Sequence, residues 1–256
     1  MIHSSAEIDP EARLSESVSV GPWSVIGPGV EIDEDTWIGP HVVIHGPAHI
    51  GKKNRIYQFN SIGDVPQDKK YSGERSRLEI GDGNVIREFC SFNRGTEGGG
   101  GVTRIGNDNW IMAYVHIAHD CQIGNATTMA NGTTLAGHVT VGNYATFGAF
   151  TVVHQFCAVG AYSFSAMGTV VLKDVPPFVT VSGNSAKPHG LNTEGLKRRG
   201  FDSDALRALR RAYKIIYRKG LTVDQALAAL EVSAREHPEV AALRDFVAGS
   251  TRGVVR

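Results

Sequence analysis

A large apolar residue occupies every sixth position along most of this chain. The pattern has no exception over residues 8–62, continues in phase over residues 80–92, and returns over residues 105–171 with one lapse, at Ser165. A period of six matches neither the roughly 3.6-residue repeat of a helix nor the simple alternation of a long strand. The pattern therefore predicts an architecture built from repeated units.

The neighbours of each large residue follow the same repeat. The position two before it is usually small, and the position after it is often glycine, as in Ile26-Gly27 and Ile123-Gly124. Because side chains alternate along a strand, a large and a small residue two positions apart point inward together. The glycine suits a corner at which the backbone turns sharply or needs a positive φ. Each unit is therefore predicted to be a short strand followed by a turn.

Three six-residue sides close a triangular coil of 18 residues, and stacked coils pair through their backbones about 4.8 Å apart. Each buried Ile, Val or Leu contributes roughly 1.5–3 kcal/mol, so the stacked interior is predicted to be the main source of stability. Two polar interruptions, at about residues 64–79 and 93–104, are predicted to be loops pushed out of the coil. The second of them is rich in glycine.

The repeat stops at Pro176-Pro177, and helical patterns follow. They predict one helix over about residues 203–218, a second to about residue 235 behind a capping box of Thr222 and Gln225, and a third from Pro238 to about residue 249. The chain is therefore predicted to be a β-solenoid over residues 1–190, followed by an α-helical domain over residues 191–256.

Composition limits the classes of function. Lys and Arg together number 26, as do Asp and Glu, so no net charge draws the chain toward nucleic acid or a membrane surface. The C-terminal region has a basic excess, which suits an acidic partner or phosphate but is equally typical of a solvated helical surface. Three cysteines without CxxC spacing argue against a disulfide framework and for a reducing compartment. With no signal peptide and no long apolar segment, a soluble cytoplasmic protein without membrane insertion is expected.

The histidines are spaced so as to gather on one edge of the predicted prism. From His119 to His138 is 138 − 119 = 19 residues, one coil plus one, and from His138 to His154 is 154 − 138 = 16, one coil less two. His116 precedes His119 on the same strand. A solvated surface position explains any one of them, whereas a cluster suggests zinc binding or acid–base chemistry. The cysteines fall at the small inward position, where packing alone accounts for them.

The motifs around these histidines resemble one enzyme family. The motifs are His116-Ile-Ala-His119-Asp120-Cys121, Leu135-Ala-Gly-His138, His154-Gln155-Phe156-Cys157, Gln67-Asp68-x-Lys70-Tyr71, Glu194-Gly-Leu-Lys-Arg198-Arg199 and Ser250-Thr-Arg-Gly253. Together they resemble the UDP-N-acetylglucosamine O-acyltransferases that begin lipid A synthesis. The resemblance covers essentially the whole chain, loops and helices included.

The resemblance implies a homotrimer of left-handed parallel β-helices, with active sites between neighbouring subunits and no cofactor. The family transfers a 3-hydroxyacyl group from acyl carrier protein to the 3-hydroxyl of UDP-N-acetylglucosamine. His119 matches its general base, and Gly137 matches the residue whose N–H faces the developing oxyanion. The basic C-terminal region would then meet acyl carrier protein as its acidic partner. The residues that match the family's substrate contacts are Asp68, Lys70, His116, His138, His154, Gln155, Asn192, Glu194, Arg198 and Arg199.

Met167 stands where family members that use long acyl chains have glycine. It lies 167 − 119 = 48 residues after His119 in the same hexad phase, or 48/18 ≈ 2.7 coils. At about 4.8 Å per coil this is about 13 Å along the axis, the length of an extended chain of about ten carbons. We expect Met167 to block the acyl groove and to select a short donor, near 3-hydroxydecanoyl. The alternative is that Met167 only packs between subunits.

Two other functions stay open from the residues alone. A zinc-dependent hydratase on the same solenoid would use the histidines as metal ligands, although carbonic anhydrases of this kind are shorter and lack the helical domain. A non-catalytic scaffold would tolerate the loss of His119. The sequence also leaves open whether the acceptor sugar carries a 3-hydroxyl or a 3-amino group.

Overall fold

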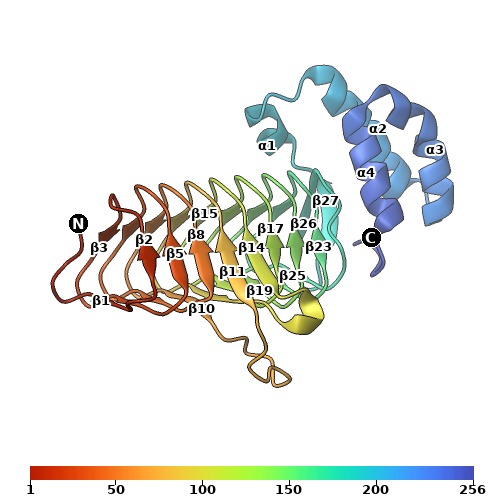
Figure 1. The fold of residues 1–256 in the computed structure, drawn as a ribbon. Helices are drawn as coiled ribbons and strands as arrows, with labels where there is room; N and C mark the ends of the chain where they lie inside the picture. Colours follow the sequence, from red (N-terminus) through yellow and green to blue (C-terminus); the bar gives the residue numbers. More distant parts are fainter.

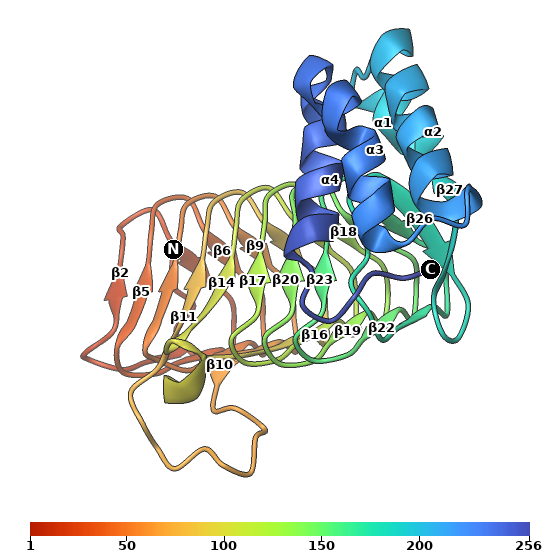
Figure 2. The same ribbon diagram turned by 90° about the vertical axis from the view of Figure 1, so that its right-hand side faces the viewer.

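Three sheets run along the molecule and form the sides of a triangular column (Figures 1 and 2). The structure is a computed structural model that describes residues 1–256. The nine-stranded sheet contains β1 (Glu7–Ile8), β4 (Val25–Ile26), β7 (Val43–Ile44), β10 (Ser61–Asp64), β13 (Ser91–Asn93), β16 (His116–Ile117), β19 (Thr134–Leu135), β22 (Val152–Val153) and β25 (Val170–Val171). The eight-stranded sheet contains β2 (Arg13–Leu14), β5 (Val30–Ile32), β8 (Ala48–Ile50), β11 (Arg77–Ile80), β14 (Val102–Ile105), β17 (Gln122–Ile123), β20 (Thr140–Val141) and β23 (Ala158–Val159). The ten-stranded sheet contains β3 (Ser19–Val20), β6 (Trp37–Ile38), β9 (Arg55–Ile56), β12 (Val85–Ile86), β15 (Trp110–Ile111), β18 (Thr128–Met129), β21 (Thr146–Phe147), β24 (Phe164–Ser165), β26 (Val179–Ser182) and β27 (Lys187–Leu191).

Each strand of the column pairs in parallel with the strand one coil later. His116 pairs with Thr134, and the two partners are 134 − 116 = 18 residues apart. The predicted coil length is therefore confirmed. Where a loop intervenes the spacing widens, but the inward phase returns, as in the pairing of Ile80 with Ile105.

The column is a left-handed parallel β-helix, as the resemblance implied. In Figure 1 the eight-stranded sheet faces the viewer and its strands run upward, while the chain advances from the N-terminus on the left to the helices on the right. The chain then passes behind, along the ten-stranded sheet, and returns along the nine-stranded sheet below. This sense of rotation along the direction of advance is left-handed.

Two segments leave the column at the edge between the nine-stranded and eight-stranded sheets. The sequence predicts them over about residues 64–79 and 93–104, but the residues outside the strands are only 65–76 and 94–101. The segments are shorter because β11 and β14 pair along four residues at their far ends. The first segment hangs below the column in Figures 1 and 2, and the second contains the 3-10 turn η1 (Glu97–Gly99).

The glycine that follows each large residue is needed for close packing, and not for a positive φ. A Cβ on Gly21 would lie 2.7 Å from Gly39 C in the next coil. Only Gly63 among these glycines has a positive φ. The left-handed conformation instead occurs two residues further on, at residues such as His41 (φ 55) and His138 (φ 61). That part of the expectation was wrong, because neighbouring coils approach most closely just after the strand.

The interior of the column belongs to a single cluster of 39 buried apolar residues, which is dominated by the large and small inward positions and also includes Tyr213 and Val255 of the C-terminal part. Cys90, Cys121 and Cys157 are buried and free, as their inward positions predict. Ser165, the one lapse in the repeat, is also buried, and its hydroxyl lies 2.8 Å from Thr151 Oγ1. A hydrogen bond between two interior hydroxyls therefore takes the place of an apolar contact there.

A hairpin and four helices follow the last full coil. β26 pairs in parallel with β24, and β27 returns antiparallel to β26, a closure that the sequence pattern did not reveal. The helices α1 (Thr193–Arg198), α2 (Ser203–Arg218), α3 (Val223–Glu236) and α4 (Pro238–Gly249) stand at the C-terminal end of the column (Figures 1 and 2). The capping box of Thr222 and Gln225 is present at the start of α3. None of these helices combines the length and the apolar character needed to span a membrane.

The chain after α4 returns to the column and ties the helices to it. Ser250 Oγ donates to Asp174 Oδ2 at 2.6 Å, and Val254 forms a parallel bridge with Asp174. Val254 and Val255 are buried against the two hydrophobic clusters. The tail therefore holds the helical part against the end of the solenoid.

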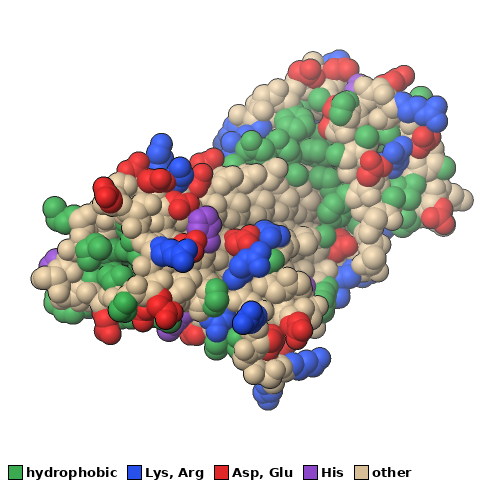
Figure 3. All heavy atoms as spheres, in the orientation of Figure 1, with side chains coloured by type: hydrophobic (Ala, Val, Ile, Leu, Met, Phe, Trp, Pro, Cys, Tyr) green, Lys and Arg blue, Asp and Glu red, His purple; other side chains and the backbone are tan.

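The three outward faces differ in charge. The eight-stranded face is charged (Figure 3): Arg13 pairs with Glu31 at 3.2 Å, and Glu79 accepts from Arg77 and Arg104, each at 2.6 Å. The other two faces carry mostly uncharged side chains, such as Ser91, Thr134, Val152 and Val170 on the nine-stranded sheet and Trp37, Trp110, Thr128, Thr146 and Phe164 on the ten-stranded sheet. The eight-stranded face is thus the one most suited to water.

The column interior generates a stability prediction. Ile44→Ala removes a side chain that is 0 % exposed, and we expect it to cost about 2–5 kcal/mol, because the neighbouring coils cannot close over the cavity. Val232→Ala is the control, since Val232 is 69 % exposed and its truncation should change stability by less than about 0.5 kcal/mol. Denaturant midpoints of the two variants measure the difference, and equal midpoints would contradict the account of the core.

Candidate active site

His119 and Asp120 form a hydrogen-bonded pair at the corner that follows β16. His119 Nδ1 lies 2.8 Å from Asp120 Oδ2, and the two side chains are 13 % and 0 % exposed. An ionised carboxylate only accepts hydrogen bonds, so we assign the proton to Nδ1 of His119. Nε2 of the neutral imidazole is then a free acceptor that can take a proton from another molecule.

The buried Asp120 carboxylate is held by donors from the second extruded segment. Thr96 donates twice, from its backbone N to Oδ1 at 2.8 Å and from its hydroxyl to Oδ2 at 2.6 Å. The backbone N of Asp120 donates to Thr103 Oγ1 at 2.8 Å. A buried charge is tolerated when its lone pairs are satisfied in this way, so the geometry supports an ionised Asp120 beside His119.

Gly137 lies one coil beyond His119, directly against its ring. A Cβ added to Gly137 would lie 2.6 Å from Cε1 and 2.7 Å from Nε2 of His119. No side chain fits there without moving the imidazole. The sequence places glycine at this position because the ring of the preceding coil occupies the space.

The N–H of Gly137 has no acceptor within the chain. At the regular corners that carry His119, Gly137 and Gln155, the N–H of the residue two after the large inward residue has no acceptor in the chain, whereas the residues on either side of it donate to a neighbouring coil. At the edge between the eight-stranded and ten-stranded sheets the corresponding N–H groups instead donate to side chains, as Lys52 N does to Asp82 Oδ1. Pro10, Pro22, Pro28 and Pro40 occupy this intermediate position, which shows that the coil does not need its N–H. The Gly137 N–H is therefore an available donor next to His119.

His138 completes the cluster from the following coil. Its ring lies edge-on to His119, with centroids 5.1 Å apart, and stacks on Phe156 at 4.4 Å. Its Nε2 is 3.7 Å from Asp120 Oδ2. Burial lowers the pKa of His138, and the nearby His119 lowers it further, while Asp120 and Asp68 oppose the shift. At neutral pH His138 is therefore a neutral hydrogen-bonding group.

The other predicted histidines lie on the same sheet edge at different distances from the pair. His116 is on β16, two residues before the corner, and its Nδ1 lies 2.8 Å from Ser91 Oγ. Burial lowers the pKa of His116. His154 is exposed two coils beyond His119, 3.3 Å from an Arg252 nitrogen, and Gln155 follows it at the corner. The gathering of His119, His138 and His154 on one edge is thus confirmed by the structure.

The first extruded segment brings Asp68 and Lys70 to this edge. They line a pocket of about 400 Å³ whose floor includes His138 and Phe156, and whose far wall is Thr96, Glu97 and Gly98 of the second segment. Asp68 Oδ1 accepts from the backbone N of Lys70 at 3.0 Å, which stiffens the turn that presents both side chains. Both segments and the histidine corner therefore enclose one pocket.

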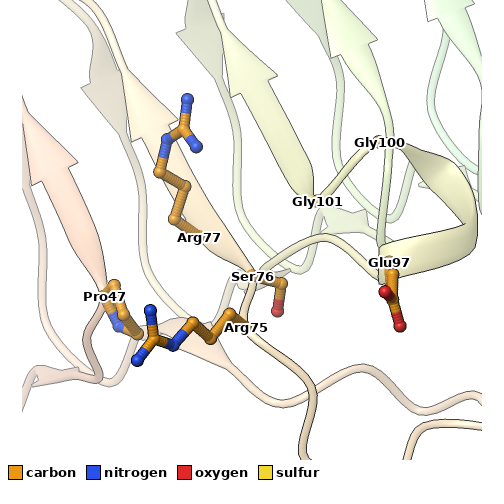
Figure 4. Close-up of a pocket in the computed structure, with 7 residues that line it drawn as sticks. All are labelled: Pro47, Arg75, Ser76, Arg77, Glu97, Gly100 and Gly101. Carbon is orange, nitrogen blue, oxygen red and sulfur yellow. The ribbon is translucent and has the colours of Figure 1, made fainter.

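A larger cavity lies on the other flank of the second segment. It measures about 580 Å³ and is lined by Pro47, Arg75, Ser76, Arg77, Glu97, Gly100 and Gly101 (Figure 4). It contains none of the predicted site residues and no histidine. The smaller pocket is the candidate site, because residues of both extruded segments line it together with His138, whose ring lies against His119 and 3.7 Å from Asp120 Oδ2.

Four predicted residues lie away from this pocket, around α1. Asn192, Glu194 and Arg198 line a pocket of about 440 Å³ on the outward face of the ten-stranded sheet. Asn192 caps α1 by accepting from Gly195 N, and its Nδ2 donates to Tyr162 O. Arg199 lies over the ring of Tyr144 at 4.7 Å. Within one chain, this group and the His119 corner are on different sides of the prism.

Met167 also lies on a different edge from His119. It follows β24, at the edge between the ten-stranded and nine-stranded sheets, whereas His119 is at the edge between the nine-stranded and eight-stranded sheets. Its side chain is 77 % exposed. The non-integral spacing of 48/18 ≈ 2.7 coils already implies this change of edge. A groove along a single edge of one chain therefore does not join the two residues.

His119, Asp120 and His138 are also the group that could hold a metal ion. Their ligand atoms lie within 4.8 Å of one another. Imidazole nitrogens with one carboxylate form a donor set that zinc accepts. In the present geometry, however, Asp120 Oδ2 already accepts from Thr96 and His119, so a metal would have to displace those donors.

Three residues of the site have no role assigned from the sequence. Asp120 and Phe156 stand within the motifs quoted above, but the motifs do not show that Asp120 binds His119 or that Phe156 stacks on His138. Thr96 reaches Asp120 from a glycine-rich loop and has no local signal. Phase arithmetic could have found Phe156, which is 156 − 138 = 18 residues after His138.

Comparisons with known proteins give consistent matches. A family model described as UDP-N-acetylglucosamine O-acyltransferase, domain 2, matches residues 174–255, and one described as bacterial transferase hexapeptide (six repeats) matches residues 103–137. The acyl-[acyl-carrier-protein]–UDP-N-acetylglucosamine O-acyltransferase of Thiobacillus denitrificans is 57% identical over 100% of this chain and 99% of its own length. The protein of the same name from Stutzerimonas stutzeri is 56% identical with the same coverage.

Solved structures match over the same extent. The UDP-N-acetylglucosamine acyltransferase of Francisella novicida superimposes with a TM-score of 0.98 at 44% identity, covering 100% of this chain and 94% of that one. The Arabidopsis protein of this name gives a TM-score of 0.81 at 35% identity, covering 100% of both chains. The match includes the column, the extruded segments and the helices.

The contact between Gly137 and His119 generates a prediction. Gly137→Ala should push the His119 ring away from Asp120, because the new methyl group would overlap the imidazole. The proton on Nδ1 should then lose its hydrogen bond, and its downfield imidazole NMR signal should disappear. Gly249→Ala is the control, since a Cβ there meets nothing within 4 Å. A Gly137→Ala spectrum identical to that of the unmodified protein would contradict this packing.

Proposed function

The chain belongs to the UDP-N-acetylglucosamine O-acyltransferase family of enzymes, and we propose that it transfers a 3-hydroxyacyl group from acyl carrier protein to the 3-hydroxyl of UDP-N-acetylglucosamine. The observation that carries this proposal is the His119–Asp120 pair beside the unpaired N–H of Gly137. Acyl transfer to a hydroxyl needs a base on one side of the reacting carbon and an oxyanion donor on the other.

His119 Nε2 is the general base of the proposed reaction. As the sugar hydroxyl attacks the thioester carbonyl carbon, its proton passes to Nε2 and a C–O bond forms. The carbonyl oxygen becomes an oxyanion, which accepts from the Gly137 N–H. The Asp120 carboxylate stabilises the imidazolium through the hydrogen bond to Nδ1–H. The C–S bond then breaks, and the departing sulfur takes the proton from Nε2.

The remaining predicted residues serve substrate binding in this proposal. His138 is neutral and can donate to or accept from a sugar hydroxyl, while His116, His154 and Gln155 extend the same edge. Asp68 and Lys70 enter from the first segment and close over the sugar nucleotide. Asn192, Glu194, Arg198 and Arg199 bind the nucleotide end, where a guanidinium suits phosphate oxygens.

A site that uses all of these residues needs two copies of the chain, and we propose a homotrimer. The His119 corner and the α1 pocket lie on different sides of one prism, so they meet only when neighbouring columns pack together. The mostly uncharged outward faces of the nine-stranded and ten-stranded sheets favour such contact, whereas the charged eight-stranded face favours solvent. The substrate then binds between subunits.

Acyl carrier protein is the proposed donor partner, and unpaired cations are available to it. Lys173 occupies the same corner position as Gln155, one coil further on, and lines a depression with Lys187 and Arg256. None of the three forms an ion pair with a carboxylate side chain in this chain. The reaction is proposed to take place in the cytoplasm, because a reducing compartment keeps cysteines such as these three as free thiols.

Acyl-transfer assays test the proposed function. We expect product from UDP-N-acetylglucosamine with 3-hydroxyacyl thioesters of acyl carrier protein, and a fall in kcat of about 10²–10⁴-fold for His119→Ala, because the hydroxyl loses its base. His49→Ala should match the unmodified enzyme, since His49 pairs with Asp33 on the charged face. Unchanged kcat in His119→Ala would refute the base assignment. Supplying the 3-amino sugar in parallel identifies the acceptor.

The donor chain length gives a second prediction. We propose that Met167 of one subunit closes the acyl groove that begins at His119 of its neighbour, so that the preferred donor is near 3-hydroxydecanoyl. Met167→Gly should raise kcat/KM for a C14 donor relative to a C10 donor by about tenfold or more, because each added methylene is worth roughly 1 kcal/mol of binding once it has space. A chain-length preference that stays the same in Met167→Gly would rule out this role.

A further inference from the structure

The orientation of His119 depends on which direction the Asp120 carboxylate faces. Asp120 Oδ2 lies 2.8 Å from His119 Nδ1 but also 3.7 Å from His138 Nε2. A small rotation of the carboxylate would therefore exchange one imidazole for the other. Something besides the two histidines must select the observed direction.

The column itself contributes little to that selection. Apart from His119, the column makes hydrogen bonds only to the backbone of Asp120: its N donates to Thr103 Oγ1, and its O accepts from Gln122 Nε2. Asp120 has a positive φ of 61°, an uncommon conformation for a residue with a side chain, although Asp tolerates it better than most. His119 Nδ1 is the one donor to the carboxylate from the coil, and the other donors come from outside it.

Those donors come from Thr96 in the second extruded segment. Its hydroxyl donates to Oδ2 at 2.6 Å, the same oxygen that accepts from His119, and its backbone N donates to Oδ1 at 2.8 Å. Thr96 is at the N-cap of η1, yet its side chain makes no capping bond there. The hydroxyl is thus committed to Asp120 and not to the local turn.

The rest of the segment is shaped to bring Thr96 to this point. A Cβ on Gly99 would lie 2.0 Å from Asp120 Cγ, and one on Gly95 would lie 2.8 Å from Asp120 Oδ1. Gly100 and Gly101 have positive φ values of 91° and 78°, which allow the chain to turn back to β14. The glycine-rich composition of the segment is therefore explained by its approach to one buried carboxylate.

We propose that Thr96 is a positioning residue for the reaction: its hydroxyl holds Asp120 Oδ2 toward His119 and away from His138, and so keeps His119 Nε2 directed at the substrate. This inference rests on the proposed function for its kinetic consequence. The second segment then has a role besides lining the pocket. It supplies the Asp120 carboxylate with donors that the backbone of the solenoid does not provide.

The segment has anchors that do not involve the Thr96 hydroxyl. Arg94 donates to Gly46 O at 2.6 Å and to Tyr71 Oη at 3.2 Å, and Asn93 donates to Val65 O at 2.9 Å. Thr96 N keeps its bond to Asp120 whatever the side chain. Removing the hydroxyl should therefore change the carboxylate and not unfold the segment.

The experiment compares Thr96→Val, Thr96→Ser and Thr140→Val in the full-length enzyme. Valine keeps the shape of threonine without its donor, and serine restores the donor without the methyl group. Thr140 is an exposed strand residue that forms no side-chain hydrogen bond, so Thr140→Val is the matched control. For each variant we would measure kcat, KM for both substrates, and the NMR signal of the His119 Nδ1 proton.

We expect Thr96→Val to lower kcat about 10- to 100-fold, the range that corresponds to one hydrogen bond to a charged group, with both KM values nearly unchanged. The Nδ1 proton signal should weaken or shift, and Thr96→Ser should recover both kcat and the signal. Thr140→Val should match the unmodified enzyme.

Two results would overturn the proposal: full kcat with an unchanged Nδ1 signal in Thr96→Val, or failure of Thr96→Ser to recover what Thr96→Val loses. The second result would mean that the methyl group, and not the donor, matters. If the unmodified protein showed no acyl transfer, the proposed function would fail on its own. The NMR comparison would then still decide whether Thr96 orients the pair.

Discussion

Backbone hydrogen bonding between successive coils is the constraint on which the rest of this structure depends. Because every strand and most corner N–H groups bond to the coil before or after, residues 18 apart are stacked in columns along each edge. At the edge between the nine-stranded and eight-stranded sheets, one N–H of each regular corner is left out of this network, at the position that proline can occupy. The same regularity that stabilises the solenoid thus leaves unpaired donors at the regular corners of this edge, and Gly137 places one of them beside His119.

A column of this kind provides position but few polar partners, and the extruded segments supply what is lacking. Both leave the edge between the nine-stranded and eight-stranded sheets, on the coils that precede His119. One brings Asp68 and Lys70 over the pocket, and the other buries the Asp120 carboxylate under Thr96. A buried carboxylate needs such donors to remain charged, and only a charged Asp120 fixes the tautomer that makes His119 Nε2 a base. The loops are therefore as necessary to the proposed chemistry as the histidines.

The sequence predicted the repeated features well and the non-repeated ones poorly. The coil length, the inward cysteines, the capping box of α3 and the clustering of His119, His138 and His154 all follow from phase and spacing. Thr96 could not be found in this way, because loop geometry brings it to Asp120 across 24 residues without any periodicity. The positive φ values were assigned to the wrong corner position, since close approach of coils, which sequence does not display, determines where glycine is needed. His119 and Met167 are 48 residues apart, which is not a whole number of 18-residue coils, so the sequence already implies that they lie on different edges.

The central claim is that one active site is built from the His119 corner of one chain and the α1 pocket of another, and mixed oligomers test it most directly. His119→Ala and Arg198→Ala chains with different affinity tags would be produced together, and complexes carrying both tags would be purified and assayed. In a cyclic trimer each mixed complex contains one interface at which both residues are intact, so about one-third of the unmodified activity should return although each variant alone is nearly inactive. Mixed complexes no more active than the two parents would contradict a site shared between chains.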